Sequence, residues 1–325
     1  MDIIKEYIIF YTIIKGNVPK KNHIMENITQ IILERNLENK LQFIKSPLNL
    51  NNIDILYIIK NGEVYLKNYF NKIVESLNNF DNIRFYLYEN NSTDSTKKLL
   101  SRLDNQCFNI KSENIKNNTN KKYFRYKNIL NARNKLLKFY KDNILLEKNI
   151  INLKFQWIVL ADIDIIYNYK TIEKLFENIN LYPDGVMFCA NTDYISKNNI
   201  QNKYYDILAL NYGKYFSLYG HNYIDMNNLL YKNDITEIET GFGGLAIIRK
   251  DVYLKNFLEN KIPNCTNQFN AFKQNFICEH WNSCYNIRKH GKIYFVKDAK
   301  ALWIEEKYYK NIDLINNYIN KLELL

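Results

Sequence analysis

Short runs of apolar residues alternate with segments of helical hydrophobic spacing from Ile53 onward, and this alternation restricts the fold more than any other feature of the sequence. The run Ile53–Ile59 is short and mostly apolar, as in a strand buried on both faces. The segment Glu63–Phe80 follows, with large apolar residues at helical spacing. Alternating units of this kind predict an α/β fold, in which helices cover both faces of a mainly parallel sheet.

The other predicted elements continue this alternation. Strands are predicted over residues 83–88, 155–161, 186–190, 245–248 and 293–296, and helices over residues 126–140, 171–179, 279–290 and 305–325, the last one amphipathic. Thr93 or Asp94 is expected to cap a helix after the second strand. The polar segment 111–122 is predicted to be a surface loop. We assign one domain to residues 51–304, preceded by an extension over residues 1–50 that carries no interpretable motif.

The composition limits the partners and the compartment. Lys and Arg number 45 against 34 Asp and Glu, a net charge of +11 that suits an anionic partner, but the lysines are scattered as on an ordinary solvated surface. No stretch has the length and apolarity of a membrane span, and the apolar run near the N-terminus lacks the features of a signal peptide. The 5 cysteines form no CxxC pair, which argues against a disulfide framework or a structural zinc site, so we expect a cytoplasmic protein.

Parallel sheets bind ligands at the carboxyl ends of their strands, here just after Ile59, Tyr88 and Ala161. After the first of these strands, Asn61 either caps the following helix or contacts a ligand. After the second comes a turn whose carboxylate, amide and hydroxyl groups can hydrogen-bond a base and a ribose, or form an ordinary capped turn. The candidate ligand-binding residues in this turn are Glu89, Asn90, Asn91, Ser92 and Asp94.

Two aspartates, Asp162 and Asp164, follow the third strand directly. Residues two apart on a strand point to the same side, and two carboxylates at the end of a buried strand repel each other unless a cation joins them. Hard oxygen ligands suit Mg²⁺ or Mn²⁺, which keep open positions for phosphate oxygens. The alternative is an Asp-x-Asp turn that arises by chance.

Three later patches carry weaker signals. Glu279 and His280 are adjacent and can supply a base, a third metal ligand or a contact to an acceptor, although a helix cap with an exposed acid explains them as well. Gly243 and Gly244 precede a strand, where they permit the close approach of a ligand or another backbone, or form a bulge. The segment Tyr204–Asp206 is a polar patch.

Taken in order, these motifs resemble the GT-A glycosyltransferases. The second strand, the segment YENNSTDST and the helix after it are similar to the acidic nucleotide-binding turn of that fold. Arg133 and Asn134 match an ArgAsn pair on its next helix. The resemblance covers about residues 53–300 and rests on the order of the motifs and on their positions relative to the strands.

The later motifs continue the same resemblance. Asp162 and Asp164 match the DxD metal motif, and Glu279 with His280 matches a Glu-Asp segment whose carboxylate often acts as the base. Further details are similar to the fungal capsule-associated (CAP59-like) mannosyltransferases: YENNSTDSTKKLLSRL, YDILAL and the Cys-Glu step before His280 resemble segments of that family. This narrower resemblance implies a mannose donor such as GDP-mannose.

The GT-A resemblance implies a nucleotide-diphosphate sugar as donor and a hydroxyl group on a glycan or glycoprotein as acceptor. Mn²⁺ or Mg²⁺ held by Asp162, Asp164 and His280 would neutralise the departing diphosphate as a Lewis acid. The turn over residues 89–94 would hold the base and ribose together with Asn61, Arg133 and Asn134.

The stereochemical outcome and the base stay open at this point. In an inverting reaction, Glu279 or His280 would take the proton of the acceptor hydroxyl, and in a retaining reaction the same residues would place the acceptor or bind the metal. Asp164 would act with them through the metal.

Other classes of protein also remain open. A non-catalytic module that binds nucleotide sugars would carry the same motifs. A sugar nucleotidyltransferase would be expected to have a glycine-rich signature after its first strand, which this chain lacks. A metal-dependent enzyme acting on nucleic acid would need a clustered Lys and Arg groove, and no basic cluster stands out, so no nucleic-acid partner is expected.

Overall fold

The computed structural model describes residues 52–80, 82–103, 107–114, 124–146, 157–196, 199–201, 211–212, 215–216, 230–256, 279–304 and 312–321. All of them belong to the unit Asn49–Leu325, one of the two into which the chain divides. The extension assigned to residues 1–50 and the patch Tyr204–Asp206 lie outside the described residues.

The first half of the described chain alternates strands and helices, as the sequence predicts. Strand β1 (Asn52–Ile59) leads into a helical segment of α3 (Glu63–Tyr65), a π-helical turn (Leu66–Phe70), α4 (Asn71–Ser76) and a 3₁₀ turn (Leu77–Asn79). The elements that follow are β2 (Asn82–Asn90), α5 (Thr96–Leu100), β3 (Phe108–Glu113), α6 (Phe124–Leu146), β4 (Trp157–Asp162), β5 (Ile165–Ile166) and α7 (Tyr169–Leu181).

The second half is richer in strands. Its elements are β6 (Gly185–Ser196), β7 (Asn199–Gln201), β8 (Asn211–Tyr212), β9 (Tyr215–Phe216), β10 (Ile235–Ile238), β11 (Leu245–Arg249), α9 (Lys250–Asn256), α11 (Glu279–Ile287), a 3₁₀ turn (Arg288–His290), β12 (Lys292–Ile304) and α12 (Ile312–Lys321). The final helix buries Ile315 and Ile319, two residues of the stripe that predicts it.

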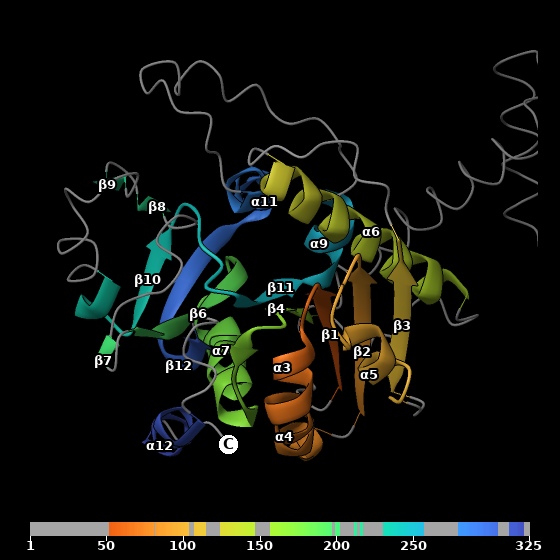
Figure 1. Cartoon of the computed structure of the whole chain (residues 1–325). Helices are drawn as coiled ribbons and strands as arrows, with labels where there is room; N and C mark the ends of the chain where they lie inside the picture. The colour runs from red at the N-terminus through yellow and green to blue at the C-terminus, as the bar shows by residue number, and fades with distance from the viewer. Residues whose placement is uncertain are drawn as a thin grey trace, which may run out of the picture. The chain divides into compact units, whose positions relative to one another are not determined.

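The central sheet has the strand order β10-β12-β6-β11-β4-β1-β2-β3 (Figure 1). Strand β1 pairs in parallel with β2 and with β4, and β2 pairs in parallel with β3. Beyond β4 the sheet is mixed, because β11 runs antiparallel to both β4 and β6, whereas β12 is parallel to β6. The α/β fold class predicted from the alternation of strands and helices, with a mainly parallel sheet, is therefore confirmed.

The sheet differs from the prediction in several places. Residues Lys111–Glu113, predicted as part of a loop, belong to strand β3. That strand lies at the end of the sheet and its residues are only half-buried, so it lacks the apolar run that marks a central strand. Strand β10 is likewise an end strand that the apolar pattern does not predict.

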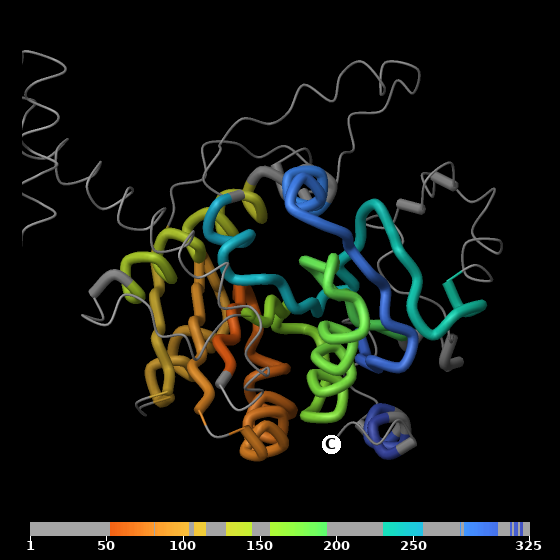
Figure 2. Tube along the Cα trace, turned by 180° about the vertical axis from the view of Figure 1, so that it is seen from behind, coloured from red at the N-terminus to blue at the C-terminus, as the bar shows by residue number. Residues whose placement is uncertain are grey.

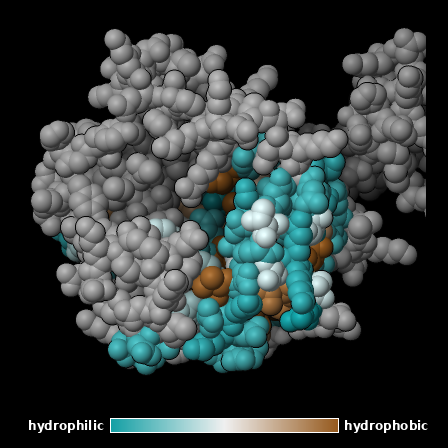
Figure 3. All heavy atoms as spheres, viewed as in Figure 1, coloured by the Kyte–Doolittle hydropathy of each residue, from teal (hydrophilic) through white to brown (hydrophobic). Residues whose placement is uncertain are grey.

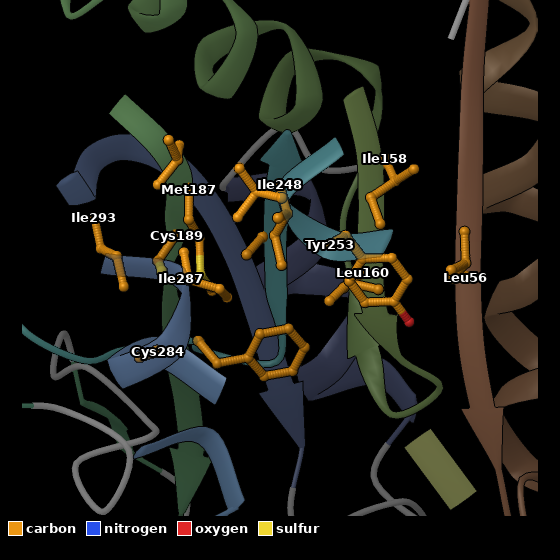
Figure 4. Packing of buried hydrophobic residues seen from close by; sticks show 14 of the residues in the cluster. Leu56, Ile158, Leu160, Met187, Cys189, Ile248, Tyr253, Cys284, Ile287 and Ile293 are labelled. Carbon is orange, nitrogen blue, oxygen red and sulfur yellow. The ribbon is translucent and has the colours of Figure 1, made fainter. Parts of the chain in front are cut away.

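Helices pack on both faces of the sheet, as predicted. On one face, Leu136 and Leu137 of α6 join a buried cluster with Leu56 of β1 and Leu160 of β4. The same cluster continues to residues of β6, β11, α9 and α11, including Met187, Ile248, Tyr253 and Ile287 (Figure 4). The group α6, α9 and α11 and the group α3, α4 and α7 lie on opposite sides in both views (Figures 1 and 2).

The opposite face is built around the helical segment after β1. The Phe70 ring packs edge-on against Tyr57 of β1 and Phe85 of β2, with centroid distances of 5.9 and 6.0 Å. Leu66, Phe70, Ile73 and Leu77, whose spacing predicts this segment, are all buried. Both faces of β1 and β2 are thus covered by helices, and β4 is buried from Trp157 to Ala161, which explains why these strands read as nearly continuous apolar runs.

A network of ion pairs around a buried aspartate lies between α6 and the sheet. Asp54 of β1 is fully buried and accepts hydrogen bonds from Arg84 Nε at 2.7 Å and from Tyr140 Oη at 2.5 Å. Lys250 Nζ lies 3.5 Å from the same carboxylate. Burial first, and then the Asp54 charge, raises the pKa of Tyr140 well above its usual value, so the hydroxyl remains a donor. The network ties α6 and α9 to the sheet.

We predict that Asp54→Asn lowers the free energy of unfolding by about 3 kcal/mol or more, because it removes the buried charge that compensates the half-buried cations Arg84 and Lys250. The measurement is chemical denaturation of both proteins. Glu177→Gln is the control, since the Lys174–Glu177 pair is exposed and its loss is expected to cost less than about 1 kcal/mol. Equal effects of the two substitutions would contradict the prediction.

The described surface is mostly polar. In Figure 3 the coloured surface is largely hydrophilic, with small apolar patches between. Leu181 and Tyr285 are the large hydrophobic side chains that stand exposed among the described residues. No described helix is both long enough and apolar enough to span a membrane.

Candidate active site

The turns after β1 and β2 are joined by hydrogen bonds at the carboxyl edge of the sheet. The Asn61 backbone N–H donates to Ser92 Oγ at 2.9 Å, and Asn61 Oδ1 accepts from the Thr93 N–H at 2.9 Å. Asn61 and Asn91 both adopt left-handed backbone conformations, with φ of 52° and 56°. Asparagine tolerates this region better than most residues, so the two asparagines fit these tight turns.

A second pair of contacts strengthens this joint. Asp94 Oδ2 accepts from the Glu63 N–H at 3.1 Å, and Glu63 Oε2 accepts from the Ser95 N–H at 2.9 Å. Hydrogen bonds from Lys67 and then from Ser95 lower the pKa of Glu63. Asp94 Oδ1 also accepts from the Thr96 N–H at 3.0 Å, at the start of α5. Asn61, Ser92 and Asp94, all candidate nucleotide-binding residues, therefore use polar atoms to hold the two turns together.

Glu89 ends the hydrogen-bonded pairing of β2 with β1 and is fully buried. Its carboxylate accepts from the Ser92 N–H at 2.8 Å and from the Ser112 hydroxyl of β3. These two donors offset part of the cost of burying a carboxylate. Asn90, the next residue, is also buried and pairs with Glu113.

The third turn, after β4, lies against the first. A Cβ atom placed on Gly62 would lie 3.3 Å from Ile163 Cγ1, so the turn after β1 touches the residue between the two aspartates. Strand β4 ends at Asp162, and Asp164 lies in the turn between β4 and β5. The argument that both carboxylates point to one side of a strand is therefore wrong for this pair, because the strand ends before the second acid.

Each aspartate is held from a different direction. The Asp162 N–H donates to Gly244 O at 2.8 Å, and Trp303 Nε1 of β12 donates to Asp164 Oδ2 at 2.8 Å. Trp303 carried no signal in the sequence, because the tryptophan lies 139 residues along the chain from the acid it contacts. Gly244 has a φ of +73°, and a Cβ there would stand 2.5 Å from the Ile165 side chain.

Helices α6 and α11 each bring one side chain to Asp162. Arg133 Nη2 of α6 donates to Asp162 Oδ1 at 3.0 Å, and the same nitrogen lies 3.3 Å from His280 Nε2 of α11. Arg133 and His280 are buried, whereas the Asp162 side chain is 24% exposed. Asn134 follows Arg133 on α6 and is half-buried. The structure thus brings together three candidate residues that are distant in sequence.

Phe242 completes this group and is a residue that the motifs did not single out. The Arg133 guanidinium carbon lies 4.8 Å from the centre of the Phe242 ring, and the His280 ring stacks on it at 4.3 Å with an interplanar angle of 18°. Phe242 stands between glycines in the sequence TGFGG, directly before β11. The sequence feature that could have identified Phe242 is its place as an aromatic residue in a glycine-rich stretch, because the glycines let this loop approach the turn after β4.

The residues only partly fit the predicted metal site. In the part of the chain that the structure describes, no group of three or more His, Cys, Asp or Glu side chains is arranged to hold a metal ion. Arg133 bonds to both Asp162 and His280, so the predicted set of Asp162, Asp164 and His280 is not assembled. The Glu279 side chain lies outside the described part.

No protein-family model matches this chain, and no curated protein matches it. Among solved structures, the chain is similar to S. aureus TarS 1–349, with a TM-score of 0.40, 11% identity, and coverage of 81% of this chain and 63% of that one. The structure of TarS 1–349 in complex with UDP-GlcNAc gives a TM-score of 0.40 at 11% identity, over 78% of this chain and 59% of that one.

A further structure of S. aureus TarS gives a TM-score of 0.42 at 11% identity, over 83% of this chain and 40% of that one. This chain therefore spans less than two thirds of the length of each TarS chain. Likeness at this level carries no argument about activity, so the case for a function rests on the site itself.

We predict that Gly244→Ala destabilises the protein by about 1–3 kcal/mol, because the new Cβ would meet the Ile165 side chain in a left-handed backbone position. Thermal unfolding measures the effect. Gly62→Ala is the matched control, since its φ of −91° suits any residue and its nearest contact would be 3.0 Å. A smaller loss for Gly244→Ala than for the control would contradict this account of the loop.

Proposed function

We propose that this chain is a glycosyltransferase that moves a hexose from a nucleotide-diphosphate sugar to a hydroxyl group of a glycan or glycoconjugate. The observation that supports this most strongly is the contiguity of three turns at one edge of the sheet. The turn after β2 is hydrogen-bonded to the turn after β1. The turn after β1 also contacts Ile163, the residue between the two aspartates. Ligands of parallel sheets bind at such an edge.

The polar groups on these turns suit the parts of such a donor. Glu89, Asn90 and Asn91 belong to the turn that would hold the base and ribose, and the interlock with Asn61 keeps that turn in one shape. At the other end of the edge, Arg133 of α6 contacts Asp162, and Asn134 follows it on the same helix. A guanidinium there can offset the negative charge that a diphosphate gathers as it departs.

Asp162 and Asp164 are the two residues that would hold Mn²⁺ or Mg²⁺, and these ions bind through one or two carboxylates with substrate phosphates as further ligands. When bound, the ion supplies Lewis-acid neutralisation of the leaving diphosphate. Asp162 would be anchored in this role by the Gly244 carbonyl, and Asp164 by Trp303.

The proton of the acceptor hydroxyl requires a base near these groups. Glu279 is our proposal, as the first residue of α11 and the neighbour of a histidine that contacts Arg133. Carboxylates are among the side chains that act as general bases in enzymes. Glu279→Gln is the substitution that would test this role.

The narrower assignment follows from the sequence resemblance alone. We propose mannose, from GDP-mannose, as the first donor to test, because the capsule-associated mannosyltransferases are the family whose segments this chain resembles in detail. The cytoplasm is the proposed site of action, on the cysteine pattern. A glycan or glycoprotein is the proposed acceptor.

We predict that Asp162→Asn and Asp164→Asn each lower sugar transfer by on the order of 100-fold or more and weaken Mn²⁺-dependent nucleotide binding, because the charge that faces the cation and the diphosphate is lost. Nucleotide release from a panel of UDP- and GDP-sugars, measured with Mn²⁺, gives the rates. Asp234→Asn is the control, since that side chain is 87% exposed and bonds only weakly to Lys297 at 3.5 Å.

Two results would separate this proposal from its rivals. Full activity of either aspartate variant on a responsive donor would contradict the role of the acidic pair. Stabilisation of the wild-type protein by a nucleotide sugar, with no nucleotide release for any donor and acceptor, would instead indicate a non-catalytic binding module.

A further inference from the structure

His280 occupies the meeting point of three elements at the candidate active site. The residue lies in the first turn of α11 and is 8% exposed. Its Nε2 atom stands 3.3 Å from Arg133 Nη2 of α6, and that nitrogen donates to Asp162 Oδ1 of β4 at 3.0 Å. A single guanidinium nitrogen therefore connects α11 to the end of β4.

The chemistry of this contact determines the state of the imidazole. A guanidinium group has only donors, so in its hydrogen bond with Arg133 the His280 Nε2 atom must be the acceptor. An imidazole whose Nε2 accepts is neutral and carries its proton on Nδ1. The Nε2 lone pair is then engaged by Arg133 and is not available to take a proton from an acceptor hydroxyl or to bind a metal ion.

Phe242 holds both partners of this hydrogen bond by their faces. The His280 ring is nearly parallel to the Phe242 ring, at 4.3 Å and 18°, and the Arg133 guanidinium carbon lies 4.8 Å from the same ring centre. Phe242 is 1% exposed, and its loop is tied to the sheet because the Thr192 hydroxyl donates to Gly243 O. The aromatic ring is thus a fixed surface against which the imidazole and the guanidinium are oriented.

We infer that His280 is a positioning residue of the glycosyltransferase site, and that it acts through Arg133 on Asp162. The imidazole and the Phe242 ring hold the guanidinium in place, and the guanidinium fixes one oxygen of the carboxylate that faces the donor diphosphate. This inference rests on the proposed function for the identity of the ligand. It assigns the two adjacent residues different tasks, because the proton-accepting role falls to Glu279 alone.

Two substitutions of His280 distinguish the contribution of its hydrogen bond to Arg133 from that of its ring stacking on Phe242. His280→Gln supplies an amide oxygen as acceptor for Arg133 without the ring, and His280→Phe keeps a ring against Phe242 without an acceptor. The readouts are the Kd values for UDP and GDP with Mn²⁺, by calorimetry, and the rate of nucleotide release from the donor to which the wild type responds.

A positioning role predicts that His280→Phe raises the nucleotide Kd by about 10-fold or more and lowers turnover with it, because a charge-assisted hydrogen bond is lost. His280→Gln is expected to remain within about 3-fold of the wild type in both, since the acceptor is restored. A general base would behave differently: both variants would lose about 10²–10⁴-fold in turnover with unchanged Kd, and that result would overturn the inference. Wild-type behaviour of His280→Phe would also overturn it.

A third substitution removes the aromatic ring and leaves both residues of the hydrogen bond unchanged. Phe242→Leu keeps an apolar side chain in the loop and removes the shared ring, and it should raise the nucleotide Kd in the same direction as His280→Phe. The comparison also serves if His280→Phe proves too unstable to purify. An unchanged Kd for a folded Phe242→Leu protein would count against the orienting role of the ring.

A ligand-free measurement distinguishes failure of this inference from failure of the proposed function. Nitrogen-15 spectroscopy of the imidazole rings at neutral pH should find the His280 Nε2 atom without a proton and Nδ1 with one. The chain has 4 histidines, so the His280 signals are those missing in His280→Gln. A proton on Nε2 overturns the inference whatever the ligand is, whereas absence of nucleotide binding to the wild type, with this tautomer present, overturns the proposed function alone.

Discussion

The hydrogen bonds that the Arg133 guanidinium makes to Asp162 and His280 are the contacts on which the candidate active site depends. Arg133 is almost entirely buried, and a buried cation is tolerated only where an opposite charge and hydrogen-bond acceptors compensate it. Asp162 supplies the charge, and His280 and the face of the Phe242 ring supply further contacts. Arg133 and these three partners come from four parts of the chain, so the group can form only when the sheet, α6 and α11 are all in place.

The rest of the edge is organised by a second set of polar contacts, which join neighbouring turns to each other. Asn61 accepts from the Thr93 N–H, while the Glu63 N–H donates to Asp94 and the Glu63 carboxylate accepts from the Ser95 N–H. The parallel pairing of β1 and β2 brings the two turns to the same level. Asn61 and Asp94, which the sequence predicts to bind a ligand, therefore also stabilise the two turns. These contacts give the turn that we propose to hold the nucleotide a preformed shape, which would lower the ordering cost of binding a flexible ligand.

Much of the fold was predictable because its strands are buried on both faces. β1, β2 and β4 show apolar runs, and the segment around Phe70 and Ile73 shows the helical period, since each pattern records local burial. β3 and β10 escaped prediction because end strands bury only part of their surface. The antiparallel direction of β11 could not be predicted from the sequence either. The direction of a strand depends on the path of the chain between strands, and the five residues of β11 do not encode that path.

The sequence by itself determined which residue types reach the carboxyl edge, because that edge follows from the order of strands and helices. Asn61, the 89–94 segment and the aspartates all lie at the end of a strand or just after it. Only the tertiary structure decided how those residues are used. Arg133 bonds to Asp162 and His280, and the Phe242 ring packs against Arg133 and His280. Trp303 donates to Asp164. All of these contacts join side chains that are far apart along the chain. Local patterns of hydrophobicity carry no record of such contacts, since each depends on the packing of two elements that the chain reaches at different points.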